Sequence, residues 1–391
     1  MTFARAFPAL TSLTMTSLVL VLACATEPVE GEDAGGAPTA TGGAGTAAGG
    51  NGPGPSATGG SGLGGGSQVP SGTGGTGAEP VDDPKVDGDG CPLTLEGFAT
   101  LASQGQNGTV GGEGGEVVTV TTQAELEQYA TAEPPYVIRV SGKIVMSPKG
   151  KEVAVKSHKT ILGVGDSGEI SQGGFFLGTG VHDVIIRNLT IGDTFVEGDW
   201  EGKTQDWDGI QMDTAHHVWI DHCELHHIGD GMIDSRKDTT NLTVSWNVLR
   251  DHNKAFGIGW TTNVTAELTI HHNWFHDLNQ RNPSTDNVLR AHLYNNLLER
   301  LTAYGNYARG GTNMVLEGSV FSDVANPHYY DTGSLVAIDN QYADTTGQKE
   351  SSGSSYSFFD PSDYYEYQLD PSSAVRELVT RCAGPRATLG Q

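Results

Sequence analysis

The chain has 391 residues, and its 22 Lys and Arg against 47 Asp and Glu give a formal net charge of −25. A protein this acidic repels phosphate, so nucleic acid is not expected as a partner, and a polyanionic sugar can bind only where cations intervene. Glycine is abundant, with 55 residues, and most of the excess lies in one early stretch, so the composition changes strongly along the chain.

Residues 1–24 have the features of an export signal. Arg5 lies in a short basic segment, residues 13–22 form an apolar run, and a small Ala23 precedes Cys24. Residues 21–24 resemble a bacterial lipobox, whose cysteine is acylated. We therefore expect a secreted or cell-surface protein, an outer-membrane lipoprotein of a bacterium that touches the membrane only through a lipid on Cys24. A plain secretory signal with a chance cysteine is the alternative.

Residues 25–90 consist mainly of Gly, Ala, Thr, Ser and Pro. Such a segment buries too little apolar surface to offset its ordering entropy, so we predict a disordered linker followed by one domain at 91–391. Cys91 and Cys382 bracket this domain, and export favours a disulfide between them over two free thiols. Cys223 lies in an apolar run, and we expect it to pack as a small buried side chain.

A helical pattern at residues 122–130 precedes a repeat that continues to the end of the domain. Short β-branched runs end in a polar, often Asn, position, and successive positions come to lie 21 to 26 residues apart. These positions are Asn188, Cys223, Asn247, Asn273, Asn296, Ser319 and Asn340. The period is too short for a strand–helix–strand unit. It predicts an all-β, right-handed parallel β-helix with an N-terminal capping helix and an Asn ladder at one corner.

Acidic pairs occur in two successive coils of this predicted solenoid: Asp206 with Asp208, and Asp230 with Asp234. Residues two or four apart in a strand project to the same face, so the four carboxylates are expected to converge. Mutual repulsion makes a hard divalent cation their natural partner, and calcium tolerates such an irregular set of oxygens. The alternative is a solvated acidic edge.

Basic residues follow the strands of two later coils, Lys254 after the coil of Asn247 and Arg281 after that of Asn273. An acidic polysaccharide needs a bridging cation and direct charge-assisted hydrogen bonds, and one groove containing both would supply them. Solvated surface charges are the alternative for each residue taken alone.

The segments at residues 136–144, 155–165, 218–222, 230–234, 252–254, 281–283 and 292–296 resemble, in order, the pectate lyase family of parallel β-helix polysaccharide lyases. The resemblance extends from about residue 97 to residue 342. It implies a calcium-dependent, monomeric enzyme that cleaves polygalacturonate by β-elimination into unsaturated oligogalacturonides, with an alkaline pH optimum.

The resemblance also assigns roles. It implies that Arg281 is the catalytic base and that Lys254 holds a substrate carboxylate. His222 belongs to a family hallmark that we expect to be structural. The implied calcium ligands are Asp206, Asp208, Asp230 and Asp234.

This chain departs from the family at Asp286, where a second arginine is common. We expect Arg290 or Arg236 to supply that substrate contact instead. Two other functions on the same scaffold stay open at this point: a glycoside hydrolase, which would use paired carboxylates without calcium, and a non-catalytic pectin-binding protein. A lyase for methylated pectin is disfavoured, because it should lack the calcium carboxylates.

Overall fold

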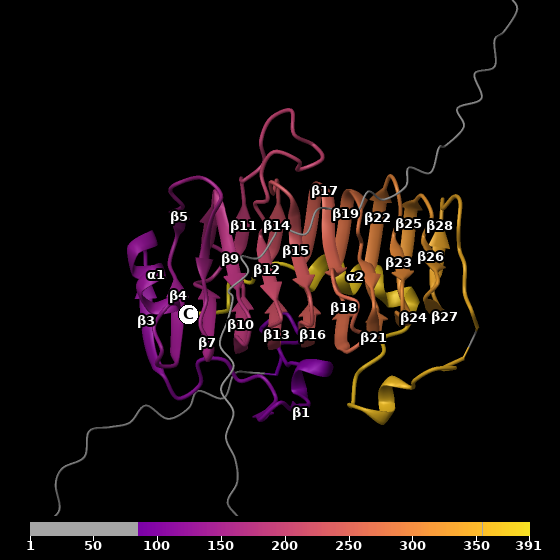
Figure 1. Ribbon diagram of the computed structural model, residues 1–391, viewed down its shortest axis with the longest axis horizontal. Coiled ribbons are helices and arrows are strands. Elements are labelled where there is room, and N and C mark those ends of the chain that lie inside the picture. The colour runs from indigo at the N-terminus through magenta and orange to yellow at the C-terminus, as the bar shows by residue number, and fades with distance from the viewer. Residues whose placement is uncertain (1–84, 354) are drawn as a thin grey trace, which may run out of the picture. The chain divides into compact units, whose positions relative to one another are not determined.

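The computed structural model describes residues 85–353 and 355–391, which form a solenoid of parallel strands (Figure 1). The coils contribute strands to three faces, and within each face a strand pairs in parallel with its equivalents in neighbouring coils. The expected parallel β-helix is thus confirmed. The predicted export signal, Cys24 and the linker as far as residue 84 lie outside the described residues.

The first face is a ten-stranded parallel sheet. From the N-terminal end its strands are β3 (Glu116–Val120), β4 (Tyr136–Val140), β7 (Lys159–Gly163), β10 (His182–Arg187), β13 (His216–Asp221), β16 (Thr240–Ser245), β18 (Ala266–His271), β21 (Val288–Tyr294), β24 (Asn313–Glu317) and β27 (Ser334–Ile338).

The other two faces share one long strand, β17 (Val248–Gly259), and together make a sixteen-stranded sheet. The second face contains β5 (Lys143–Val145), β8 (Glu169–Ser171), β11 (Thr190–Gly192), β14 (Glu224–His226), the first part of β17, β19 (Trp274–Gln280), β22 (Leu297–Leu301), β25 (Val320–Val324) and β28 (Gln341–Ala343). The third face contains β6 (Lys151–Ala154), β9 (Gly173–Leu177), β12 (Ile210–Asp213), β15 (Gly231–Arg236), the last part of β17, β20 (Ser284–Asp286), β23 (Asn306–Arg309) and β26 (His328–Asp331).

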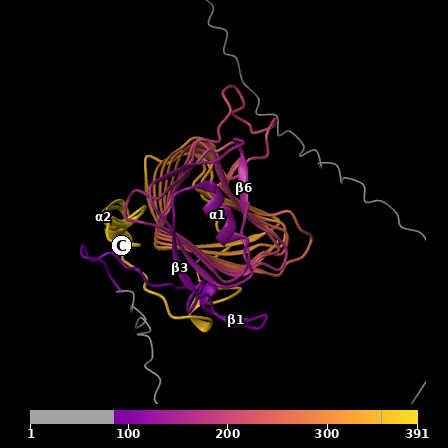
Figure 2. The same cartoon turned by 90° about the vertical axis from the view of Figure 1, so that its left-hand side faces the viewer.

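Helix α1 (Gln123–Ala130) covers the N-terminal end of the solenoid, as predicted (Figure 2). Thr122 caps it: the Thr122 side chain accepts from the Glu125 amide, and the Glu125 carboxylate accepts from the Thr122 amide. This reciprocal pair satisfies backbone donors that the first helical turn would otherwise leave free. Leu126 and Ala130 face inward and belong to the central apolar core.

Few other elements lie outside the coils. Strands β1 (Ala102–Ser103) and β2 (Gln106–Asn107) form an antiparallel pair, and two short 3₁₀ helices are Phe98–Thr100 and Pro361–Asp363. Helix α2 (Ser372–Cys382) packs Val375 and Val379 against the side of the solenoid. No helix in the described ranges has the length and apolarity that a membrane span requires.

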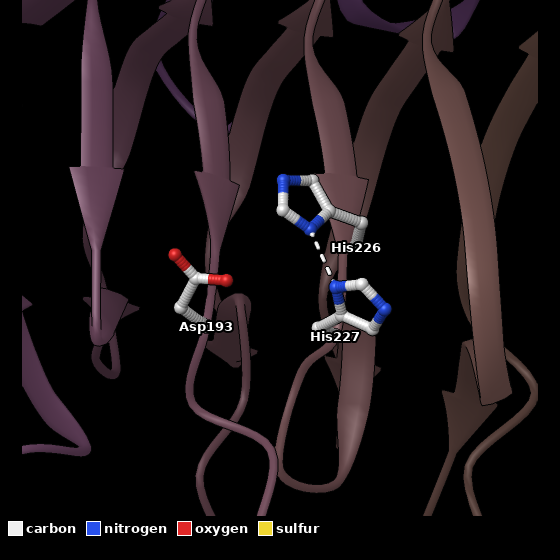
Figure 3. Close-up of side chains that lie close together, drawn as sticks. All are labelled: Asp193, His226 and His227. Carbon is white, nitrogen blue, oxygen red and sulfur yellow. Dashed lines mark hydrogen bonds between the residues drawn. The ribbon is translucent and has the colours of Figure 1, made fainter.

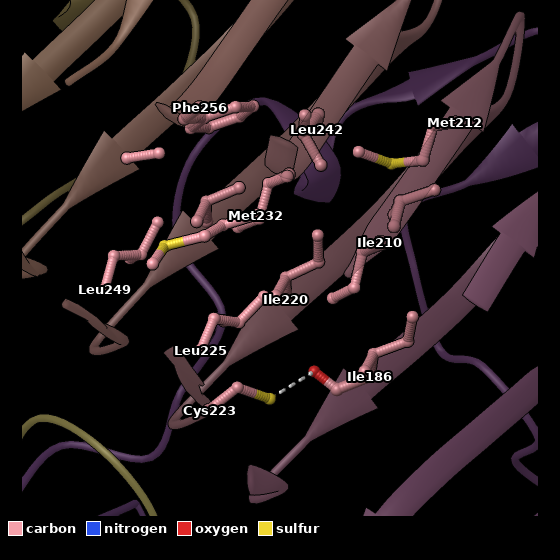
Figure 4. Packing of buried hydrophobic residues seen from close by; sticks show 14 of the residues in the cluster. Ile186, Ile210, Met212, Ile220, Cys223, Leu225, Met232, Leu242, Leu249 and Phe256 are labelled. Carbon is pink, nitrogen blue, oxygen red and sulfur yellow. Dashed lines mark hydrogen bonds between the residues drawn. The ribbon is translucent and has the colours of Figure 1, made fainter. Parts of the chain in front are cut away.

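Aliphatic side chains fill the interior by stacking from coil to coil (Figure 4). Ile186 and Ile220 are paired neighbours of β10 and β13, and both are fully buried. Cys223 lies in the same core as a free thiol, and its Sγ donates to the Ile186 carbonyl at 3.6 Å. The expected packing role of Cys223 is confirmed. Stacking of this kind removes apolar surface from water that a single coil cannot cover alone.

The predicted Asn ladder runs along one corner. Asn247 Nδ2 donates to Asn273 Oδ1 at 2.9 Å, and Asn273 Nδ2 donates to Asn296 Oδ1 at 3.1 Å. Further along, the Ser319 amide donates to Asn340 Oδ1 at 2.8 Å. Asn188 is an exception, because the pairing of β10 with β13 aligns it with residue 222 rather than 223. Its amide instead donates to the carbonyls of residues 163 and 165.

A disulfide joins Cys91 to Cys382 across 291 residues of sequence. Both cysteines are buried against Trp246, so the bond ties the two ends of the domain to the side of the solenoid rather than to its tips. The residues just before Cys91 also belong to the fold, whereas the sequence placed residues 85–90 in the linker. Asp87 forms an ion pair with Arg386 at 2.7 Å, which anchors this segment.

Candidate active site

The four predicted cation ligands come together on the outer surface of the third face. Asp206 and Asp208 end the long loop between β11 and β12, which projects beyond the coils in Figure 1. Asp230 precedes β15, and Asp234 lies within it. Because β12 and β15 are paired neighbours, successive coils bring these side chains to one place. Carboxylate oxygens of Asp206, Asp208 and Asp230 all lie within 4.8 Å of one another.

Asp234 lies close to this group, because its carboxylate and that of Asp208 both approach the backbone of Gly231. A Cβ atom on Gly231 would lie 2.4 Å from Oδ1 of Asp234 and 3.2 Å from Oδ1 of Asp208. The two carboxylates therefore close around a backbone position that has no room for a side chain. The group of Asp206, Asp208, Asp230 and Asp234 is termed the acidic cluster below.

The acidic cluster contains buried oxygens that lack a partner. Asp208 Oδ1 accepts from the Gly231 amide at 2.7 Å, but Asp208 Oδ2 and Asp234 Oδ1 have no hydrogen-bond partner among the described residues. A buried carboxylate is costly unless a donor or cation meets it. Calcium takes about six to eight oxygen ligands in flexible geometry, so this set of donors fits calcium.

Burial and mutual repulsion raise the pKa values of the buried members. The pKa of Asp208 lies well above its ordinary value, mainly because of burial and then because of Asp234 and Asp230. Burial raises the pKa of Asp234 to about 7, although the nearby Arg281 guanidinium opposes the rise. Both shifts show that the metal-free cluster strongly disfavours its full negative charge.

These shifts predict a pH-dependent effect of replacing Asp234. Because the folded-state pKa is raised, ionising Asp234 costs stability as the pH rises from about 4, the ordinary carboxyl pKa, through about 7. In chelator, Asp234→Asn should therefore have a higher melting temperature than wild type at pH 8 and nearly the same melting temperature at pH 5. Each kcal/mol of unfolding free energy gained corresponds to about 2–4 °C. Thermal melts at both pH values measure the difference in melting temperature between variant and wild type. The effect of histidine titration cancels in this difference, because both proteins contain the same histidines. Equal differences at the two pH values would contradict the proposed cost, and the exposed Asp166→Asn is the control.

Glu152 is a fifth carboxyl at this site, which the sequence analysis did not identify. It lies on β6, and its Oε1 accepts from the Asp208 amide at 3.2 Å. Burial raises its pKa to about 7, and Asp206 adds to the rise. Glu152 is separated from Asp208 by more than fifty residues and follows a lysine, so only the stacking of coils reveals that it belongs here.

Lys254 lies at the base of the acidic cluster. Its Nζ forms a short ion pair with Asp230 Oδ1 and donates to the Glu201 carbonyl at 2.6 Å. Its side chain is 7 % exposed. Lys254 thus partly compensates Asp230 and ties the projecting loop to β17, while its contact with a substrate carboxylate stays a prediction.

Arg281 lies beside the acidic cluster, between β19 and β20. Its guanidinium carbon is 5.3 Å from the centre of the Trp260 ring, a cation–π distance, and Trp260 is 48 % exposed. Gly257 lies between them and the cluster, because a Cβ there would be 2.5 Å from the Trp260 ring and 2.9 Å from Asp234 Oδ1. A side chain at residue 257 would therefore collide with both Trp260 and Asp234, so glycine lets the Trp260 ring pack close to the acidic cluster.

Of the two arginines expected to replace a second family arginine, only Arg236 reaches this site. Arg236 Nε lies 3.2 Å from Asp213 Oδ1, and its Nη1 lies 3.9 Å from Asp206 Oδ2. The expectation for Arg290 is wrong, because β21 belongs to the first face. There Arg290 pairs with Glu267 and lies 4.6 Å from the Tyr364 ring centre.

A different arginine, Arg309, accompanies Arg281 on the third face. Asp286 and Arg309 are paired positions of β20 and β23, and Arg309 Nη2 lies 3.0 Å from Asp286 Oδ2. The buried Tyr304 lies within reach of the charges of both Arg281 and Arg309. The spacing of 23 residues between Asp286 and Arg309 equals one coil, so the repeat carried the signal for this pair.

His222 has a structural position, as expected. It is fully buried, and its Nδ1 lies 2.6 Å from Asp221 Oδ2. Arg187 Nε contacts the same Asp221 oxygen at 2.8 Å. This buried group follows the first face, whereas the acidic cluster lies on the third.

Comparison with known proteins assigns this chain to a family. A family model described as pectate lyase matches residues 93–387. The pectate trisaccharide-lyase of Thermotoga sp. (strain RQ2) is 34% identical over 324 residues, which cover 74% of this chain and 88% of that protein. A pectate trisaccharide-lyase of Bacillus licheniformis is 32% identical over 312 residues, covering 75% of this chain and 86% of its own.

Solved structures show the same architecture. The pectate lyase Bsp165PelA from Bacillus sp. N165, determined in complex with trigalacturonate, superposes with a TM-score of 0.64 at 26% sequence identity. The superposition covers 75% of this chain and 99% of that one.

Proposed function

Because this chain belongs to the pectate lyase family, a family of polysaccharide lyases, we propose that it cleaves polygalacturonate by calcium-dependent β-elimination. One observation carries the proposal: Asp208 and Asp234 have unpartnered buried oxygens, and the charge of Arg281 acts on Asp234. A cation site and a basic side chain on one open surface are what elimination from a uronate requires. The trigalacturonate bound to Bsp165PelA supports the choice of substrate.

The acidic cluster is proposed to hold the calcium ion. Calcium, when bound, would neutralise the cluster and draw charge from a substrate carboxylate, which makes the adjacent C5 proton easier to remove. Asp208 and Asp234 are held in place by burial, and Lys254 orients Asp230. Glu152 fixes the start of β12 through the Asp208 amide and adds negative charge at the edge of the cluster.

Arg281 is proposed to remove the C5 proton. The electrons of the C5–H bond form a double bond to C4, the bond from C4 to the glycosidic oxygen breaks, and that oxygen takes a proton from water. An arginine side chain is almost always charged, with a usual pKa above about 12, so only its small neutral fraction acts as a base. We therefore propose an alkaline pH optimum.

The test is the appearance of unsaturated product from polygalacturonate, followed by ultraviolet absorbance with and without chelator. Absorbance that depends on calcium supports the proposal. New reducing ends without absorbance would indicate the glycoside hydrolase, and binding without any product would indicate the non-catalytic alternative. Export, acylation of Cys24 and the monomeric state stay predictions, because the residues or partners they involve lie outside the described structure.

We further expect Arg309 to bind a substrate carboxylate in place of the second family arginine. A charge-assisted hydrogen bond contributes about 1.5–3 kcal/mol, so Arg309→Ala should raise KM for polygalacturonate about tenfold or more while kcat changes little. Arg309→Lys should recover part of the loss, because it keeps the charge but not the paired donors. Steady-state kinetics in saturating calcium measures the split.

Arg300 offers a matched control for this prediction. It contacts Asp277 at 2.7 Å from the next coil, as Arg309 contacts Asp286, but this pair lies on the second face. Arg300→Ala should leave KM unchanged. If Arg300→Ala and Arg309→Ala raise KM equally, the effect is structural and Arg309 does not bind substrate.

A further inference from the structure

We propose that Asp193, His226 and His227 form a second metal site, selective for Zn²⁺ over calcium. Asp193 follows β11, His226 ends β14, and His227 comes next in the chain. One potential ligand atom from each lies within 4.8 Å of the other two. Figure 3 shows the Asp193 carboxylate facing the two imidazoles from the neighbouring coil.

The two imidazoles already have the separation of zinc ligands. His226 Nδ1 and His227 Nδ1 lie 3.1 Å apart. Two nitrogens bound to one tetrahedral zinc at about 2.0–2.1 Å would be about 3.3 Å apart. His227 has a φ of 48°, which turns the two successive side chains toward the same side of the strand end. A hydrogen bond joins the two Nδ1 atoms, so binding one ion requires this bond to break and both rings to turn toward the metal.

The Asp193 carboxylate is oriented by a neighbour, as ligating carboxylates commonly are. Ser171 Oγ, one coil earlier, donates to Asp193 Oδ2 at 3.0 Å. Lys143 Nζ lies 3.6 Å from the same oxygen, but its closer partner is Glu169 at 2.7 Å. Ser171 therefore fixes the carboxylate, and Lys143 competes only weakly for it.

The donor set distinguishes this site from the acidic cluster. Two imidazole nitrogens and one carboxylate suit zinc, whereas calcium prefers oxygen ligands alone. Three protein ligands leave a further position of a tetrahedral ion for water.

The position of this site gives the metal a structural role. The Phe195 amide donates to the His227 carbonyl at 2.8 Å, and the Gly229 amide donates to Thr194 Oγ1 at 2.8 Å. These bonds join the start of the projecting loop to the turn that leads into β15. The loop carries Asp206 and Asp208 at its other end, and the turn carries Asp230, so zinc would clamp together the two segments that deliver calcium ligands.

Two other histidine pairs show what is specific to this one. His216 with His217 and His271 with His272 have Nδ1 atoms 2.8 Å and 2.9 Å apart. Among the described residues neither pair belongs to a group of three close potential metal ligands. The close nitrogens are therefore a common feature of this fold, and the third ligand, Asp193, is what distinguishes His226 and His227.

The test is isothermal titration calorimetry, in which ZnSO₄ is added to protein that has been stripped of metals and then saturated with calcium. The calcium occupies the acidic cluster, so zinc can bind only elsewhere. Wild type should bind one zinc per chain and melt a few degrees higher with it. Even outer-shell changes weaken metal sites about 10–100-fold, so Asp193→Ala, His226→Ala and His227→Ala should each weaken zinc binding at least about tenfold. His216→Ala, which breaks a pair without a third ligand, should bind zinc as wild type does.

Circular dichroism and an unchanged calcium-induced rise in melting temperature must show that each variant is folded. The proposal is overturned if wild type takes up no zinc in calcium, or if the His226→Ala/His227→Ala double variant binds zinc as tightly as wild type. If zinc binding is lost in Asp234→Asn but kept in the Asp193, His226 and His227 variants, the zinc binds in the acidic cluster and the proposal is also overturned. None of these readouts requires turnover, so they are independent of the lyase activity.

Discussion

Arg281→Ala is expected to lower kcat on polygalacturonate about a thousandfold or more, because a positioned general base typically contributes about 10²–10⁴. The guanidinium lies beside the Trp260 ring, and its charge acts on Asp234. Initial rates of unsaturated product at saturating calcium measure the loss.

The control for Arg281→Ala is the integrity of the fold and of the calcium site. The variant should melt near wild type and should show at least the same calcium-induced rise in melting temperature, since no calcium ligand is removed. Arg281→Lys should stay well below wild type, because a lysine carries its charge at a different place and with different geometry. A variant that keeps more than about a tenth of wild-type kcat would show that another group removes the proton.

Chelation and Asp234→Asn are expected to have the second large effect. Removing calcium should abolish turnover, and Asp234→Asn should raise the calcium concentration for half-maximal activity about 10–100-fold, because ligand charge sets calcium affinity over several orders of magnitude. Asp234 Oδ1 is buried and unpartnered, so replacing it removes an oxygen that only a cation would satisfy. Rates measured across a calcium titration give this value directly.

Asp234→Asn should also separate two properties that usually change together. Without metal the variant should be more stable than wild type at pH 8, because the buried charge is gone. With metal it should be less active, because the cation site is weaker. The exposed Asp166→Asn should change neither. Full calcium sensitivity in Asp234→Asn, or full activity of wild type in chelator, would remove Asp234 from the site.

The arrangement of charges on the third face explains how this chain departs from its family. Asp286 stands where a second arginine is common, yet it does not leave the surface acidic, because Arg309 pairs with it from the next coil. We therefore expect Arg309, one coil later, to supply the positive charge. A substrate would then meet Arg281 and Arg309 on successive coils, which is why Arg309→Ala is expected to change KM and not kcat.

The sequence alone was sufficient for the fold, and it also named the four aspartates that the structure brings together. The polar positions from residue 247 to residue 340 mark each coil, because an inward amide at a corner must find a partner in the next coil. The spacing of the acidic pairs led us to name Asp206, Asp208, Asp230 and Asp234 together. The structure places Asp206 and Asp208 in the loop before β12, so they reach the cluster from a loop and not from a strand face. Arg281 followed from the order of the coils and from the family resemblance.

Only the tertiary structure decided which face each remaining side chain occupies. From the sequence we expected Arg290 near Arg281 and did not identify Arg309, but β21 lies on the first face and β23 on the third. Glu152 joins Asp208 from a distant part of the sequence, and Asn188 falls one residue out of register with the ladder. Spacing along the chain counts coils well. It does not tell how many residues each corner consumes, and a corner longer by one residue turns the following side chains to the opposite side of the strand.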